Sequence, residues 1–310
     1  MKILVTGSNG YIGARLSKYL LNQKFEVRMS TRSPLTPSAD FESAENVILD
    51  LENASEMQLE QACLGCDQVI HLANLNDQQC RENPERALRV NGLGTWKLLQ
   101  ACERTKISKF IYFSTAHVYG SPLSGNYFEN SPTRPKTHYA ITHRLAEAYV
   151  LSSNLQSPVV LRLSNAIGAP LFQENNCWML LVNDLCRQVV TTNTMTLKSS
   201  GIAKRNFVAL SDVESTINSL LHSKNPPATL NMMGRETFSI LDMTKMIGER
   251  FNKLFDSNYK LIIPDVPPEP TPPNFSLQTL YLNDVSNQTS LVSAIDETLL
   301  FCQKFRGQNS

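Results

Sequence analysis

The amino-acid sequence predicts an α/β protein built on a doubly wound parallel sheet, with a smaller lobe in the C-terminal half. Two observations predict this fold. In the first half, short apolar segments alternate with segments of helical periodicity, which implies parallel strands joined by right-handed crossovers. After about Asn165 the alternation loosens, and a proline-rich segment from Pro264 to Pro273 cannot continue a helix or a central strand.

The expected strands are short and largely apolar, as strands covered by helices on both faces should be. They are residues 3–5, 26–30, 46–49, 68–72, 110–114 and 159–163, and the expected helices are residues 11–22, 57–64, 84–105 and 139–154. Ligands of such folds bind at the carboxyl edge of the sheet. We therefore expect a sheet domain over residues 1–165 and a substrate-binding lobe over residues 166–310, whose segments can interleave with the first domain.

The composition narrows the class of protein. Of the 310 residues, 42% are hydrophobic and 18% are charged, which is typical of a globular protein. The formal net charge of +1 gives no reason to expect nucleic acid or a membrane as partner, and no apolar run approaches the roughly 20 residues that cross a bilayer. The seven cysteines are scattered, and Cys63 and Cys66 lack a second pair at zinc-binding spacing, so we interpret these two as small packing residues rather than as a redox or metal-binding pair. Because Met1 leads directly into the first strand and the cysteines suggest a reducing compartment, we expect a cytoplasmic protein. The histidines and cysteines lack defined ligand spacing, so we expect no bound metal.

A glycine-rich loop, Thr-Gly-Ser-Asn-Gly-Tyr-Ile-Gly at residues 6–13, joins the first strand to the first helix. Gly7 permits a tight turn, Gly10 lets the backbone approach a diphosphate, and Gly13 allows close packing of the helix. The helix N-terminus then offers free N–H groups to phosphates. This context predicts a dinucleotide-binding Rossmann domain for NADP or NAD. The other loop residues expected at the cofactor are Asn9, Tyr11 and Ile12.

The end of the second strand distinguishes NAD from NADP. An acidic residue there would bond the ribose 2′-hydroxyl, whereas an arginine accommodates a 2′-phosphate. The strand ends in Ser-Thr-Arg-Ser at residues 30–33, so Arg32 favours NADP, although a solvated surface arginine is the alternative. Asp50, after the third strand, can accept a hydrogen bond from the adenine amino group or cap a helix.

Further motifs follow at regular intervals. They are Asp50-Leu51, Val69-Ile70-His71-Leu72-Ala73, Asn91 with Gly94-Thr95, the heptapeptide STAHVYG at residues 114–120, Tyr139, LRLSN at residues 161–165 with Gly168, and Arg205-Asn206-Phe207. Together with the glycine loop, this pattern resembles the extended short-chain dehydrogenase/reductases, a family of sugar-nucleotide epimerases, dehydratases and reductases. It runs from residue 3 to about residue 235. The resemblance implies a nucleotide-sugar substrate, a homodimer formed by the helices at 84–105 and 139–154, and cofactor contacts from Leu51, Leu72, Ala73 and Asn91.

The family's reaction uses a serine or threonine and a tyrosine while the nicotinamide exchanges hydride, and the matching positions here are Thr115 and Tyr139. A free tyrosine titrates near pH 10, and the family lowers this value with a lysine four residues later. Here that position holds His143. A histidine protonated near pH 6.5 would partly replace the lysine, whereas a neutral one supplies only hydrogen bonds, for example to the cofactor ribose. An inert histidine on the helix surface is the third interpretation.

The resemblance also limits the reaction and places the substrate. Family dehydratases have an acidic residue directly after the threonine, but Ala116 and His117 occupy these positions, which disfavours dehydration. His117 or His138 can transfer protons or simply line the pocket. Arg205 matches the position that grips the substrate diphosphate, unless it only caps a hydrophobic run, and Asn165 matches another substrate contact. Trp178 can stack on a base or pack in the core.

Two functions follow from these residues. The first is an NADP(H)-preferring oxidoreductase that reduces or epimerises a nucleotide-activated sugar at the 4-position. In it Tyr139 transfers the proton, Thr115 orients the reacting oxygen, and His143 replaces the lysine. Arg32 favours reduction slightly. The second is a catalytically silent NADP(H)-binding sensor or scaffold, which the missing lysine motivates.

Overall fold

Seven parallel strands form the central sheet of the computed structural model, which describes residues 1–34, 38–265, 267, 270, 272–281, 283, 285 and 289–306. The strand order is β11-β7-β5-β4-β1-β2-β3. From β1, successive strands are added first on one side (β2, β3) and then on the other (β4, β5, β7, β11), as in the doubly wound dinucleotide-binding folds. The bounds are β1 (Lys2–Thr6), β2 (Glu26–Thr31), β3 (Glu45–Ile48), β4 (Gln68–His71), β5 (Lys109–Thr115), β7 (Ser157–Leu163) and β11 (Thr229–Met232). The predicted fold class is confirmed.

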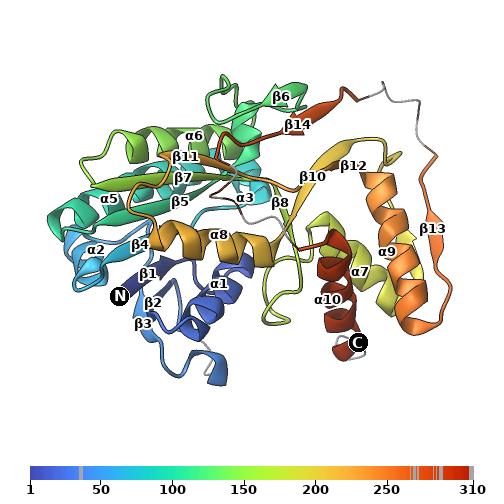
Figure 1. Ribbon diagram of the computed structural model, residues 1–310, viewed down its shortest axis with the longest axis horizontal. Coiled ribbons are helices and arrows are strands. Elements are labelled where there is room, and N and C mark those ends of the chain that lie inside the picture. Colours follow the sequence, from blue (N-terminus) through green and yellow to red (C-terminus); the bar gives the residue numbers. More distant parts are fainter. Residues whose placement is uncertain are drawn as a thin grey trace.

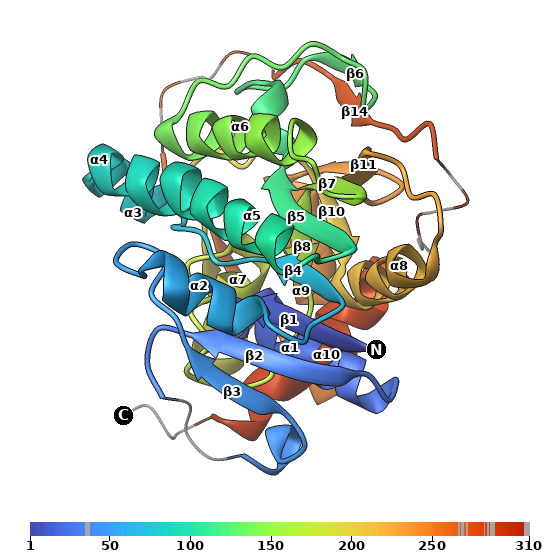
Figure 2. The same ribbon diagram turned by 90° about the vertical axis from the view of Figure 1, so that its left-hand side faces the viewer.

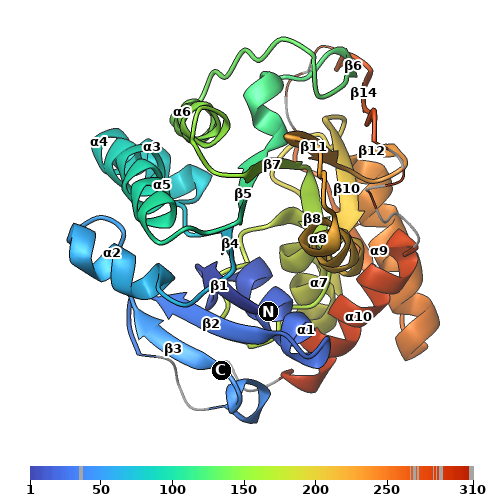
Figure 3. The same cartoon turned by 60° about the vertical axis from the view of Figure 1, so that its left-hand side comes forward.

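Helices cover both faces of this sheet because its strands are apolar on both sides. In β1, Ile3 and Val5 pack against α1 (Tyr11–Asn22) and α8 (Leu210–His222), whereas Leu4 packs against α2 (Glu56–Cys63), α5 (Thr95–Arg104) and α6 (His138–Leu151). Figure 3 shows these two layers on opposite sides of the sheet. Cys63 and Cys66 belong to the second layer, which supports their interpretation as packing residues.

The expected helix at residues 84–105 is a succession of three segments. These are α4 (Pro84–Ala87), a π-helical segment η2 (Leu88–Gly94) and α5. Asn91 lies in η2, where its carbonyl oxygen accepts a hydrogen bond from the Thr95 hydroxyl at 2.7 Å. A preceding short helix, α3 (Asp77–Glu82), was not predicted.

The second half of the chain builds a lobe beside the carboxyl edge of the sheet (Figure 1). It contains α7 (Leu181–Thr192), α9 (Ile240–Phe255) and α10 (Leu291–Lys304), which share one hydrophobic core. Strand β10 (Lys204–Ala209) pairs with β8 (Asn165–Ile167) and β12 (Thr237–Ser239), and β9 (Thr194–Thr196) pairs with β13 (Lys260–Ile262). Between these elements, α8 and β11 return to the large sheet.

A small two-stranded sheet joins distant parts of the chain. Strand β14 (Phe275–Leu277) pairs with β6 (Gly125–Tyr127), and the two lie side by side at the rim in Figure 2. Of the proline-rich segment 264–273, residues 266, 268, 269 and 271 lie outside the described residues, and the others are neither helix nor strand. In the described part of the chain, no helix is long and apolar enough to cross a membrane.

Candidate active site

Two glycines of the loop, Gly7 and Gly13, lie so close to neighbouring backbone atoms that a residue with a side chain cannot replace them. Gly7 has a φ of +70°, and a Cβ atom there would lie 2.9 Å from the backbone nitrogen of Ala73. A Cβ atom on Gly13 would lie 2.2 Å from the carbonyl oxygen of Gly7. Such contacts exclude any side chain without a shift of the backbone. The turn and the close packing assigned to Gly7 and Gly13 are therefore present in the structure.

The N-terminus of α1 opens into a cavity of about 490 Å³, which is lined by Gly7, Gly10, Tyr11, Ile12, Gly13 and Leu72, among others. No side chain caps this helix at Gly10, and no acidic residue lies in its first turn. Its first N–H groups and positive dipole end are thus free for an anion, and the residues present fit the diphosphate of a dinucleotide.

Two other loop residues connect this cavity to the lobe. The Tyr11 hydroxyl donates a hydrogen bond to the carbonyl oxygen of Gly168 at 2.6 Å. The Asn9 carbonyl oxygen accepts one from the side chain of Asn175 at 3.0 Å. Sequence reasoning assigned Tyr11 and Asn9 to the cofactor, and the structure shows that both also fasten the loop to the lobe.

Arg32, Asp50 and Leu51, which were expected near the adenine end of the cofactor, do not line either cavity. Arg32 is exposed after β2 and does not line either cavity described here. Leu51 is buried in the core beneath the π-helical segment. The alternative of Asp50 as a helix cap is wrong, because α2 is capped by Ser55, whereas Asp50 accepts hydrogen bonds from Glu52 and Asn53 in its own turn.

Buried polar side chains fix the loop that follows β4. The Asn91 side-chain oxygen accepts a hydrogen bond from the Leu75 backbone at 2.8 Å, and its nitrogen donates to Thr142 at 3.1 Å. Asn91 therefore joins this loop to α6. His71 contacts the Thr6 hydroxyl through Nδ1 at 2.6 Å and the Thr95 hydroxyl through Nε2 at 2.9 Å.

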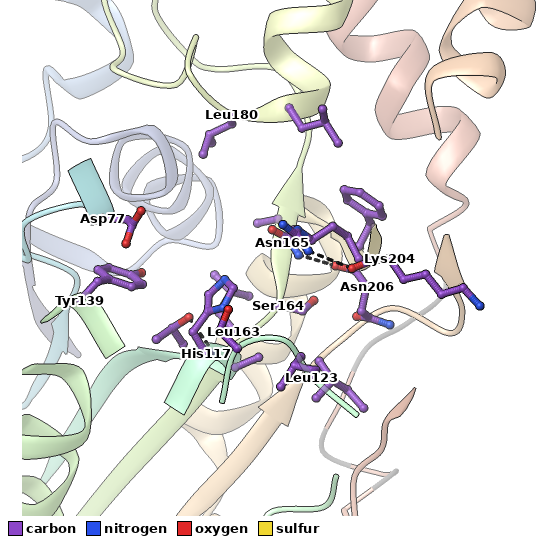
Figure 4. A pocket seen from close by; sticks show the side chains of 18 of the residues that line it. Asp77, His117, Leu123, Tyr139, Leu163, Ser164, Asn165, Leu180, Lys204 and Asn206 are labelled. Atoms are coloured by element: carbon purple, nitrogen blue, oxygen red, sulfur yellow. Dashed lines mark hydrogen bonds between the residues drawn. The ribbon is translucent and has the colours of Figure 1, made fainter. Parts of the chain in front are cut away.

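A second cavity, of about 670 Å³, brings the expected reacting residues together. Its lining includes Thr115 at the end of β5, His117 in the following turn, and Tyr139 at the start of α6. Asn165 and Arg205 line it from the lobe. In Figure 4, Tyr139 lies on one side of this cavity and Asn165 on the other. Tyr11 and Ile12 line both cavities, so the two spaces adjoin.

His143 lies behind Tyr139 and is not among the residues that line either cavity. It is buried, so the interpretation as a surface histidine is wrong. Its Nδ1 atom lies 2.7 Å from the Tyr112 hydroxyl, and its Nε2 atom is buried without a hydrogen-bond partner among the described residues. Burial, with smaller contributions from His71 and His117, lowers the pKa of His143 to about 3. The lowered pKa favours a neutral ring at physiological pH, which is the alternative in which His143 supplies only hydrogen bonds.

Among the described residues, no cation adjacent to Tyr139 lowers its pKa. Burial raises the pKa of Tyr139 to about 12, and a hydrogen bond with the Thr115 side chain opposes this rise. Burial lowers the pKa of His117, and the Arg205 guanidinium lowers it further. At neutral pH the cavity therefore presents a protonated phenol beside an uncharged imidazole.

The remaining candidates, His138 and Trp178, do not line the cavity that contains Thr115 and Tyr139. His138 is exposed at the start of α6 and does not line the cavity. Trp178 donates a hydrogen bond to the Gln173 carbonyl oxygen at 2.9 Å and packs against the lobe core, so the packing interpretation holds. Among the described residues, no group of three or more potential ligands could hold a metal ion.

Helix α3, which was not predicted, contributes two further residues to the cavities. Asp77 and Arg81 form an ion pair of 3.2 Å and line both cavities, and Asp77 lies near Tyr139 in Figure 4. A signal was present in the sequence, because Asn76 and Gln79 form a capping box at the start of this helix. Lys204, Ser164 and Asn206 also line the larger cavity without having been predicted.

Comparisons with known proteins agree with the fold described above. The chain is 25% identical over 271 residues to an uncharacterized UDP-glucose epimerase of Bacillus subtilis, covering 80% of this chain and 82% of the relative. A UDP-glucose 4-epimerase from Thermotoga maritima, solved with UDP-glucose, has a TM-score of 0.82 at 19% identity, over 98% of this chain and 99% of that one. MoeE5 in complex with UDP-glucuronic acid and NAD has a TM-score of 0.81 at 20% identity, with the same two coverages. The model of the NAD dependent epimerase/dehydratase family matches residues 3–232, and the chain therefore belongs to that family.

Proposed function

We propose that this protein is an NAD(P)-dependent oxidoreductase that acts on a nucleotide-activated sugar by 4-keto reduction or by epimerisation. One observation carries the proposal. Thr115 and Tyr139 come from different elements yet line one cavity, which adjoins the cavity at the glycine loop. A bound nicotinamide would exchange hydride with the sugar carbon.

In this proposal Tyr139 donates a proton to the sugar oxygen, and the Thr115 hydroxyl orients that oxygen. A phenol whose pKa is raised to about 12 stays protonated at neutral pH. It is therefore suited to act as the general acid of a reduction. Epimerisation also requires proton removal from the sugar hydroxyl, for which the raised pKa is a handicap. The raised pKa of Tyr139 thus favours reduction.

The lobe supplies groups for a nucleotide diphosphate. Arg205 and Lys204 line the cavity at the start of β10, and Asn165 lines it from the neighbouring strand. A guanidinium fork suits a diphosphate. The B. subtilis relative and the T. maritima structure are named for UDP-glucose, which supports a sugar nucleotide as the substrate here.

The proposed cofactor is NADP(H) in preference to NAD(H). Arg32 is exposed at the end of β2, and residues 30–33 contain no acid that would repel a 2′-phosphate. NAD in the MoeE5 complex supports the alternative. The Arg32→Ala variant should bind NADPH less tightly and NADH equally, and equal losses for both would favour NAD(H).

The proposed assembly is a homodimer formed through α5 and α6. These helices expose apolar side chains on one surface, with the rings of Trp96 and Tyr149 6.5 Å apart. Ile141 and Leu151 of α6 are also exposed. Gel filtration at micromolar concentration that shows a monomer would contradict this assembly.

The activity is tested with purified protein, NADPH and a panel of 4-keto nucleotide sugars. We expect turnover that Tyr139→Phe abolishes and Tyr259→Phe preserves, because Tyr259 packs on Gly248 in the lobe and does not line either cavity. Tight NADPH binding without turnover on any substrate would instead favour the second candidate, a silent NADP(H)-binding protein. The neutral His143 beside Tyr139 is the observation behind that candidate.

A further inference from the structure

Five aromatic rings lead from the sheet to the reacting tyrosine, and we refer to them as the ring column. Their order is Phe110, His71, Tyr112, His143 and Tyr139. Successive ring centroids are 5.7, 5.6, 5.8 and 4.5 Å apart. Every ring except that of Tyr139 is buried, and Tyr139 lines the larger cavity. The column therefore connects rigid strand residues to the residue that we propose as the proton donor.

The two histidines of the column are held very differently. His71 is held at both ring nitrogens by the hydroxyls of Thr6 and Thr95. His143 is held at Nδ1 alone, by the Tyr112 hydroxyl at 2.7 Å, while its Nε2 atom has no partner among the described residues. The orientation of the His143 ring consequently depends on one hydrogen bond.

The same hydrogen bond decides which nitrogen carries the proton. The Tyr112 oxygen lies 3.4 Å from the side-chain oxygen of Asn74, beyond the usual 2.5–3.0 Å of O–H···O hydrogen bonds. The nitrogen of His143 is therefore the only partner of ordinary length for the Tyr112 proton in the described structure. With the Tyr112 hydroxyl as the donor to Nδ1, the single proton of the neutral imidazole lies on Nε2.

The Tyr139 ring packs edge-to-face against this imidazole, with an interplanar angle of 69°. Since the two residues are one helical turn apart on α6, rotation of the imidazole would alter the surface on which the phenol rests. Tyr112 lies on β5 and does not line either cavity, so it acts on the substrate site through its neighbours, among them His143.

We infer that Tyr112 is a positioning residue, whose hydrogen bond to Nδ1 keeps His143 in the Nε2–H tautomer and in the orientation that supports the Tyr139 ring. The inference rests on the proposed function, in which Tyr139 is the proton donor. Its central element, the tautomer, can be measured without any ligand.

The decisive experiment is nitrogen-15 NMR of the histidine side chains in the ligand-free protein, with His143 assigned by comparison with His143→Gln. We expect His143 in the Nε2–H form in the wild type and a mixture of tautomers in Tyr112→Phe. The His71 signals should not change in that variant. Tyr119→Phe is the matched control, because it also removes a buried, hydrogen-bonded hydroxyl but should leave the His143 signals unchanged. A wild-type Nδ1–H form, or a Tyr112→Phe spectrum identical to that of the wild type, overturns the inference.

Kinetics provides the second readout. A misplaced catalytic group lowers kcat more than substrate affinity, so Tyr112→Phe should lower kcat by about tenfold and leave KM for the nucleotide sugar unchanged. A higher KM at unchanged kcat contradicts the positioning role. If Tyr139→Phe itself retains full turnover, the proposed function fails, while the NMR experiment still decides the tautomer.

Discussion

Replacing His143 by lysine would restore a cation one helical turn from the reacting tyrosine. The imidazole is neutral because burial lowers its pKa to about 3, and the pKa of Tyr139 is raised to about 12. A unit charge about 4 Å from the phenol is worth roughly 4 kcal/mol at an effective dielectric constant near 20. That energy equals about three pKa units, which would bring the pKa of Tyr139 to about 9. At pH 8 the phenolate fraction would then rise from about one in ten thousand to about one in ten.

The measurement is a tyrosinate absorbance titration together with the pH dependence of both reaction directions. We expect the His143→Lys variant to ionise Tyr139 at lower pH and to oxidise the sugar alcohol faster at pH 8, with little gain in reduction. His143→Met is the matched control, since it has similar length without a charge. An unchanged titration in His143→Lys, or an equal effect of the methionine, would refute the electrostatic account of this position.

Three further predictions concern the frame around the site. Gly13→Ala places a Cβ atom 2.2 Å from the Gly7 carbonyl oxygen and should lower NADPH affinity by about tenfold or more in calorimetry; undiminished affinity would show that the loop can yield. Glu147→Gln removes the partner of buried Arg162, a pair joined at 2.8 and 2.9 Å, and should lower the free energy of unfolding in urea by about 3–5 kcal/mol; a loss below about 1 kcal/mol would contradict this. Burial lowers the pKa of His71 to about 3, below its unfolded value near 6.5, so the unfolded chain binds the extra proton and stability falls as pH decreases from 6.5 towards 3. The slope for this residue is about 1.4 kcal/mol per pH unit, and His71→Gln should reduce the measured pH dependence by that amount.

The sheet was predictable wherever local pattern alone determines structure. The expected helix at residues 11–22 matches α1, and its glycine loop and apolar stripe are local features. Strand β11 was missed because its stability comes from distant residues. The polar residue Asn231 lies within this strand. Its side chain accepts a hydrogen bond from the Tyr119 hydroxyl and donates one to the Gln278 carbonyl oxygen, and both partners are far away in the sequence. A four-residue strand with a polar centre resembles a loop until those partners are known.

The members of the site were predictable, but their charge states were not. Motif positions placed Thr115, Tyr139, Asn165 and Arg205 at a common site, and all four line one cavity. The neutral state of His143 comes from its burial, and its hydrogen-bond partner Tyr112 lies in β5, where the sequence shows only one aromatic residue of a buried strand. Both the burial of His143 in α6 and its hydrogen bond with Tyr112 in β5 arise only when the chain folds, so neither can be seen in the sequence.

If Tyr139 acts as proposed, the histidine in place of the lysine determines in which direction the phenol can transfer a proton. For proton removal at pH 7, a phenol with a pKa of about 12 must first ionise, which costs about 7 kcal/mol. For proton donation the phenol is already in the required form, and no such cost arises. Asp77, which lines the same cavity, raises the pKa further and so opposes ionisation. Within the proposed function, a tyrosine beside the neutral ring of His143 is thus suited to the reduction of a carbonyl, whereas epimerisation would also require this phenol to lose its proton.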